Sequence, residues 1–140
     1  MLARAAERLA AWNRGDVDAS VANVVDDVLW RDVALGMPLS GREALRSAAR
    51  RYMSAFPDLR VEATSSTLAG PRLVQELTVT GTHQGELLGV PATGRWTEIY
   101  AAVIITYDED AMVIEGAAYW NLLAMLQQLG VAPSLEAATA

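Results

Sequence analysis

The spacing of apolar residues changes once along the chain, and this change is the strongest constraint on the fold. Before Pro57, apolar residues recur every three or four positions, as at Leu2, Ala5 and Leu9, a spacing typical of amphipathic helices. From Leu59 onward the period falls to two, which is typical of half-buried strands. Helices followed by an antiparallel meander predict an α+β fold, with helices covering one face of a curved sheet.

Turn and capping residues divide the chain into expected elements. A first helix ends in the turn 13–16, and a second, capped by Asp16 or Asp18, carries Val21, Val24 and Val25. A third helix follows the loop 36–41, with Ser40 as its N-cap, and ends near Phe56. The expected strands are 28–33, 60–68, 72–83, 95–107 and 112–120, and a last helix covers 122–129.

A chain of 140 residues has room for one substantial hydrophobic core. We therefore expect a single domain over residues 1–131 and a C-terminal tail over residues 132–140. The N-terminus lacks the apolar stretch of a signal peptide. The longest apolar run, 99–105, is far shorter than the roughly 20 residues that span a membrane. These features predict a cytoplasmic protein.

Charge and composition exclude several classes of function. The net charge is −6, which argues against nucleic-acid and membrane partners because both require clustered positive charge. All 11 basic residues are arginines, so Schiff-base chemistry on lysine is excluded. There is no cysteine, and a single histidine, His83, makes a multi-histidine metal site implausible. We therefore expect neither a metal nor another cofactor.

Four stretches, taken in order, resemble one protein family. They are Ala11-Trp-Asn-Arg-Gly-Asp16, the segment 38–45 together with Phe56-Pro-Asp-Leu59, the glycine-rich segment 81–95, and Tyr119-Trp-Asn followed by the final helix. Together they are similar to the SnoaL-like polyketide cyclases, which have the nuclear-transport-factor-2-like cone fold. The resemblance implies a conical barrel, usually a homodimer, with an apolar pocket between the concave sheet face and the helices.

The resemblance also implies a mechanism whose usual residues are missing here. Characterised cyclases of the family close a polyketide ring without a cofactor, using an Asp on the final strand and a His on the preceding long strand. Carried over by motif, the Asp position falls on Ala118 and the His position on Val103. Neither side chain can transfer a proton.

Residues expected to line the pocket are mostly apolar. Strand alternation places Ile114, Gly116, Ala118 and Trp120 on one face of the final strand. Gly116 and Ala118 either make room for a ligand or pack closely against Trp30 or Phe56. The complete set of expected substrate-binding residues is Trp12, Trp30, Ala48, Phe56, Ile99, Val103, Gly116, Ala118 and Trp120.

Two polar residues remain as candidates for catalysis. Asp32 follows Trp30 by two residues, so both side chains should point the same way, and a carboxylate beside an indole suits a general acid or base. Tyr52 lies on the inner stripe of the third helix and can offer a hydroxyl to a carbonyl. Each also has a structural interpretation: Asp32 can bind loop amides, and Tyr52 can be a core residue.

Three functions stay open on the sequence alone. The first is a cofactor-free enzyme that cyclises or isomerises a hydrophobic, polyketide-like substrate, either through Asp32 and Tyr52 or by shaping the substrate. The second is a non-catalytic module that binds an apolar small molecule. The third is an engineered or reassigned scaffold of the cone fold. A homodimer is expected because the reverse sheet face is apolar, with Trp96, Tyr100, Ala102, Ile104, Ala117 and Tyr119.

Overall fold

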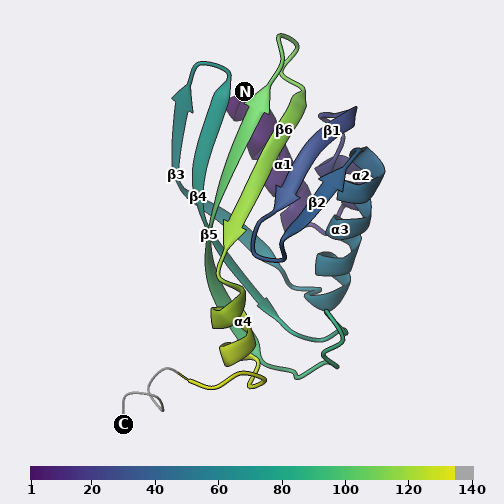
Figure 1. The fold of residues 1–140 in the computed structure, drawn as a ribbon, viewed down its shortest axis with the longest axis vertical. Helices are drawn as coiled ribbons and strands as arrows, with labels where there is room; N and C mark the ends of the chain where they lie inside the picture. The colour runs from purple at the N-terminus through teal and green to yellow at the C-terminus, as the bar shows by residue number, and fades with distance from the viewer. Residues whose placement is uncertain (135–140) are drawn as a thin grey trace.

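Among residues 1–134, six strands form one sheet, and four helices pack against it or extend from it (Figure 1). A computed structural model describes residues 1–134. The helices are α1 (Leu2–Asn13), α2 (Val17–Ser20), α3 (Arg42–Ala55) and α4 (Leu122–Gln128). The strands are β1 (Val24–Asp32), β2 (Met37–Ser40), β3 (Arg60–Ala69), β4 (Arg72–Thr82), β5 (Trp96–Tyr107) and β6 (Val113–Trp120). The α+β architecture predicted from the change in periodicity is confirmed.

The sheet is mixed rather than wholly antiparallel, which corrects the prediction. Its order is β2-β1-β6-β5-β4-β3, and β3 to β6 form the expected meander. Strand β1, however, pairs with β6 in parallel, with Trp30 opposite Gly116 and Asp32 opposite Ala118. Because the first three strands of the meander, β2 and α3 lie between β1 and β6 in the chain, local periodicity could not indicate their relative direction. This ladder brings the end of β1 beside the end of β6.

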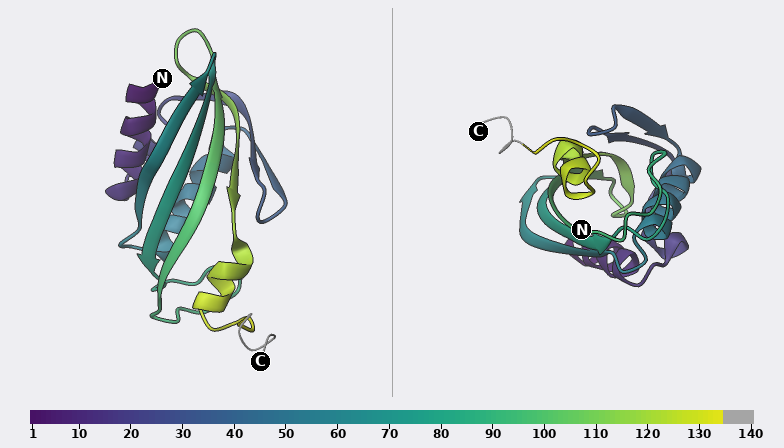
Figure 2. Two further views of the ribbon diagram at one scale, coloured as in Figure 1. Left: turned by 90° about the vertical axis from the view of Figure 1, so that its left-hand side faces the viewer. Right: turned by 90° about the horizontal axis from the view of Figure 1, so that it is seen from below.

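The sheet curves around the interior of the molecule, and the helices complete the enclosure. Seen from below in Figure 2, β3, β4 and β5 bend around the centre while α1 and α3 lie across the open side. Helix α4 follows β6 and lies at the lower end in Figure 1. Its N-cap is Asn121, whose side chain accepts a hydrogen bond from the Ala124 N–H at 2.9 Å. The interior is therefore bounded by sheet on one side and helices on the other.

The second predicted helix is much shorter than the sequence suggests. Asp16 caps α2 by accepting a hydrogen bond from the Ala19 N–H at 3.0 Å, but the helix ends at Ser20. Val24 and Val25, expected on that helix, belong to β1. The spacing of these valines fits either structure, and β-branched side chains favour strands. Pairing of Val24 with Val113 of β6 supplies the tertiary contact that decides the outcome.

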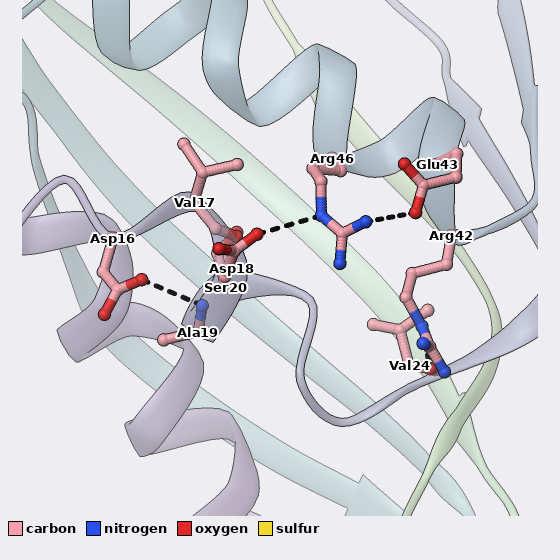
Figure 3. Close-up of polar contacts among 9 residues, drawn as sticks. All are labelled: Asp16, Val17, Asp18, Ala19, Ser20, Val24, Arg42, Glu43 and Arg46. Atoms are coloured by element: carbon pink, nitrogen blue, oxygen red, sulfur yellow. Dashed lines mark hydrogen bonds and ion pairs between the residues drawn. The ribbon is translucent and has the colours of Figure 1, made fainter.

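Arginines of α3 hold the short helix and the start of β1 in place (Figure 3). Arg46 contacts Asp18 of α2 at 3.1 Å and also pairs with Glu43 one turn away on its own helix. Arg42 donates from Nε to the Val24 carbonyl at 2.9 Å. It also forms an ion pair with Asp26 at 2.9 Å. The N-terminal part of α3 is thereby joined to α2 and to β1.

The segment expected to be a loop before α3 contains β2. Residues 37–40 form an antiparallel hairpin with β1, in which Ser40 pairs with Leu29. Ser40 therefore lies in a strand and is not the N-cap. That position is taken by Gly41, whose φ of 94° lies in the left-handed region that favours glycine.

The core lies between the concave sheet face and the helices. Leu73, Ile105, His83 and Val28 are its largest fully buried side chains. Within the described residues, no helix combines the length and the apolar character needed to cross a bilayer. Of the tail expected over 132–140, residues 135–140 lie outside the described part of the chain.

Candidate active site

A largely apolar cavity of about 210 Å³ opens between the concave face of the sheet and helices α1 and α3. Its aromatic lining comes from separate elements: Trp12 from α1, Trp30 from β1, and Trp120 from β6. Of the residues expected to bind substrate, those that line it are Trp12, Trp30, Ala48, Phe56, Ile99, Val103, Ala118 and Trp120. Asp32 and Tyr52, the two catalytic candidates, lie in the same wall.

Gly116 is the one expected substrate-binding residue that does not line this cavity. A Cβ atom built on Gly116 would lie 2.3 Å from Cζ3 and 2.7 Å from Cε3 of the Trp30 indole. The missing side chain thus makes room for Trp30, its neighbour in the parallel ladder, and not for a ligand. Of the two interpretations of the small residues in β6, close packing applies to Gly116, whereas Ala118 does face the cavity.

An irregularity in β6 changes which residue faces inward at its start. The register with β5 shifts after the pair Thr106–Glu115, so that Tyr107 pairs with Val113. Val113 is therefore buried and lines the cavity, whereas Ile114, expected on the inner face, is exposed. A bulge of this kind has no signature in simple alternation, because it inserts one residue into the period of two.

Asp32 is the polar centre of the site. It ends β1, is only 5% exposed, and its carboxylate accepts hydrogen bonds from side chains of two other elements. The Tyr52 hydroxyl donates to Oδ2 at 2.7 Å, and the Trp120 indole Nε1–H donates to Oδ1 at 2.9 Å. The Leu35 backbone N–H makes a longer contact with Oδ1 at 3.4 Å. Within residues 1–134 no basic side chain forms an ion pair with Asp32.

Tyr52 is held as a neutral hydroxyl. Burial raises the pKa of its phenol well above the ordinary value, and the hydrogen bond to the Asp32 carboxylate raises the pKa further. Its ring also meets the Trp120 indole edge-on, with ring centroids 6.3 Å apart and an interplanar angle of 86°. Asp32, Tyr52 and Trp120 therefore brace one another, and we refer to them as the Asp32 triad.

The two positions where the family resemblance implies an acid–base pair lie side by side. Val103 of β5 pairs directly with Ala118 of β6, and both line the cavity. Ala118 in turn pairs with Asp32 on its other side. Strands are separated by about 4.8 Å, so Asp32 lies one strand away from the implied Asp position, at the same level of the sheet. The cavity thus retains a carboxylate beside the place where the family Asp is expected.

Two functional features could not be identified from the sequence. Trp120 was expected as an apolar wall, but its indole N–H is also a donor to Asp32. Arg8 lines the cavity from α1 and was not among the candidates. The only signal for Arg8 is its spacing, four residues before Trp12 on an otherwise apolar helix stripe.

His83, the sole histidine of the chain, is completely buried outside the cavity lining. Its Nδ1 atom accepts a hydrogen bond from the Thr93 N–H at 3.2 Å and lies 3.0 Å from the Thr93 hydroxyl. The ring packs against Phe56 with centroids 5.5 Å apart. Its contacts are those of a structural residue. In the described part of the chain, no cluster of three or more His, Asp or Glu side chains is arranged to hold a metal ion.

The α+β domain, with its curved sheet and apolar cavity, has the ketosteroid isomerase-like fold. The sequence profile of the SnoaL-like polyketide cyclases matches residues 3–129, and the chain belongs to this family. No curated protein matches the chain.

Similar solved structures agree with this assignment. AclR from Streptomyces galilaeus, a proposed hydroxylase, is 28% identical with a TM-score of 0.83, over 94% of this chain and 96% of that one. TsrD from Streptomyces laurentii is 27% identical with a TM-score of 0.81, over 93% and 94% of the two chains. IdmH from Streptomyces antibioticus, a proposed polyketide cyclase, is 23% identical with a TM-score of 0.79, over 93% and 98%, and supports the fold.

Proposed function

We propose that the protein is a cofactor-independent enzyme of the cyclase type, acting on a hydrophobic polyketide-like substrate with Asp32 as general base. The observation that carries this proposal is the position of Asp32. Its carboxylate lies in the cavity wall, and Asp32 pairs with Ala118 in the neighbouring strand. Ala118 is the position at which the family resemblance implies the catalytic Asp. The proposed role thus moves the family's acid–base function from β6 to the adjacent strand β1.

The hydrogen bonds of Asp32 leave it able to accept a proton. An ionised carboxylate has about four acceptor positions. The donors Tyr52, Trp120 and Leu35 occupy three of them, so one remains for a substrate. Both side-chain donors also hold the carboxylate at a fixed angle, which favours proton transfer because it reduces the reorganisation needed in the transition state.

The proposed chemistry requires no oxidant or metal. Asp32 removes a proton from a carbon next to a carbonyl, leaving an enolate. In cyclisation, the enolate carbon attacks a second carbonyl of the same molecule, one C–C bond forms, and the new alkoxide takes back the proton from Asp32. In isomerisation, the proton returns to a different carbon. Either product is an isomer of its substrate, so atoms and electrons balance without a co-reactant.

The apolar lining suits this chemistry in a second way. Aromatic walls from Trp12, Trp30 and Trp120 provide flat surfaces on which an unsaturated chain can fold. Folding the chain brings the enolate carbon near its target, and such positioning contributes a large part of the acceleration of intramolecular reactions.

The proposal is tested by turnover of a panel of linear and partly cyclised poly-β-ketones, with isomeric products separated by chromatography and identified by mass spectrometry. We expect wild-type protein to convert at least one compound and Asp32→Asn to lose about 10²- to 10⁴-fold in kcat. Asp27→Asn is the matched control, because Asp27 is an exposed carboxylate on the same strand.

Two outcomes would overturn the assignment. If Asp32→Asn retained the wild-type rate, Asp32 would not be the base. If no compound were converted while several bound tightly, the protein would be a binding module for apolar molecules.

A further inference from the structure

One charged side chain in the cavity has no role in the chemistry proposed above. The guanidinium of Arg8 contributes to the cavity wall from α1. Its Nε and Nη2 atoms are buried, and neither has a hydrogen-bond partner within residues 1–134. No ion pair of the described residues includes it either. Two buried guanidinium nitrogens without partners are unusual, because unsatisfied buried polar groups destabilise a protein.

Arg8 also stands out among the described residues of the cavity lining by its positive charge. Among the described residues that line the cavity, Arg8 is the only basic side chain and Asp32 the only carboxylate. They come from different elements, α1 and β1. Burial lowers the pKa of Arg8, and the electrostatic effect of the buried Tyr107 phenol raises it to a smaller extent. No carboxylate among residues 1–134 neutralises the guanidinium.

Arg8 and Asp32 also lie at different levels of the sheet. Tyr107, the neighbour of Arg8, pairs with Val113 at the start of β6, whereas Asp32 pairs with Ala118. Along β5, whose residues 107 and 103 pair with Val113 and Ala118, these levels are four residues apart, which corresponds to about 13 Å. A molecule in contact with both charged groups must therefore be elongated, with an apolar body between two polar ends.

We propose that Arg8 binds the carboxylate of an elongated substrate acid whose other end reaches Asp32. This inference rests on the proposed function, because it names the substrate class of the same cavity. A carboxylate is the group that matches a guanidinium best, since it accepts two parallel charge-assisted hydrogen bonds. Nε and Nη2, the two unpartnered donors, lie on the same edge of the guanidinium and can both be satisfied by one carboxylate.

The anchoring would also determine which carbon reacts. With the acid end fixed at Arg8, only a carbonyl-adjacent carbon at a set distance along the chain reaches Asp32. Esters and amides of the same acids lack the negative charge and should bind without this preference. The protein would thus act on free acids, and a reaction that releases an acid from a thioester or ester must precede it.

The test compares two small probes of equal shape, octanoate and octanamide, by isothermal titration calorimetry at neutral pH. We expect wild-type protein to bind octanoate at least about tenfold more tightly than octanamide. In Arg8→Met, which keeps an unbranched side chain without the charge, the preference should disappear while octanamide binding stays within about twofold. Arg31→Gln, at an exposed arginine on the outer face, is the matched control and should keep the preference.

Two results would overturn the inference: equal binding of the probes by wild-type protein, or a preference for octanoate that persists in Arg8→Met. Circular dichroism establishes that Arg8→Met is folded, and Arg8→Gln serves as a second variant if it is not. Failure of this inference is separable from failure of the proposed function. Asp32→Asn should lose turnover but keep the octanoate preference, whereas Arg8→Met should lose the preference whether or not Asp32 is the base.

Discussion

At the scale of single residues, Gly116 provides the space into which the Trp30 side chain packs. The indole of Trp30 lies where a side chain at position 116 would be. Trp30 in turn forms part of the cavity wall. Gly116 of β6 has no side chain, and this leaves the space that the Trp30 indole of β1 occupies. The shape of the cavity therefore depends on Gly116, although Gly116 does not line it.

This packing predicts that Gly116→Ala is destabilising. A Cβ atom 2.3 Å from the indole must displace Trp30 or the strand, and overpacking of this kind costs roughly 1–3 kcal/mol. Urea unfolding followed by circular dichroism measures the loss. In a Trp30→Leu background the same substitution should cost less than half as much, because the smaller side chain removes the clash. Equal costs in both backgrounds would contradict this packing.

The sequence pointed to several residues of the cavity but not to the contacts between them. Asp32 and Tyr52 could be proposed because they are polar residues at positions that periodicity turns inward. The hydrogen bond between them joins residues 20 positions apart, and the bond from Trp120 to Asp32 spans 88 positions. Such contacts depend on strand order and register, which single-sequence periodicity does not encode. Arg8 was missed because a lone arginine on a helix is ordinarily solvated.

At the scale of elements, the end of α1 is joined to the sheet by the side-chain amide of Asn13. Asn13, the last residue of α1, donates from Nδ2 to the Val61 carbonyl at 3.0 Å and accepts from the Val61 N–H at 2.6 Å. Val61 lies in β3, the edge strand of the sheet. The Asn13 amide thus forms both hydrogen bonds that a neighbouring strand would make with Val61. It holds in place the helix that carries Arg8 and Trp12.

Replacing this amide should weaken the whole domain. In Asn13→Ala both backbone groups of Val61 lose their side-chain partner, and we expect a loss of about 1–3 kcal/mol in the free energy of unfolding. Asn13→Asp is the matched control, because it keeps an acceptor for the Val61 N–H and should retain part of the stability. Chemical denaturation monitored by tryptophan fluorescence provides the measurement. An unfolding midpoint equal to that of wild type would show that the clamp contributes nothing.

The elements themselves could be predicted wherever one signal dominated. The four long strands and the third helix have strict alternation or clear terminators such as Pro57, and their observed bounds differ from expectation by only a residue or two. The prediction failed between Asp16 and Gly41, where helix and strand signals overlap. There the valines at 21, 24 and 25 satisfy a helical spacing, and only the pairing of β1 with β6 selects the strand.

At the scale of the whole molecule, the outer face of the sheet carries large exposed aromatic side chains. Tyr100 is 71% exposed, Trp96 58% and Tyr119 38%. They lie on β5 and β6, the two adjacent strands at the centre of the sheet. Large exposed aromatic groups on one sheet face are typical of a surface that binds another protein. We propose that this face joins two copies of the chain, as the family resemblance implies.

Sedimentation velocity tests the proposed dimer directly. Wild-type protein should sediment as a dimer, and Tyr100→Arg should shift the population towards monomer because it places a charge in an apolar interface. Leu68→Arg is the control, since Leu68 is an exposed apolar residue near the end of the edge strand β3. A monomeric wild-type protein, or a dimer unaffected by Tyr100→Arg, would exclude this face as the interface.

The parallel pairing of β1 with β6 has a consequence for how the chain is made. Synthesis proceeds from the N-terminus, so Asp32 and Tyr52 emerge well before Trp120 exists. Until β6 is complete, the inner edge of β1 has no neighbour, and an unpaired apolar strand edge invites aggregation. A chain that ends before Trp120 therefore lacks the complete partner strand of β1 and the indole that donates to Asp32. Truncation before β6 should therefore lower the yield of folded protein even where the stability of the complete fold is unchanged.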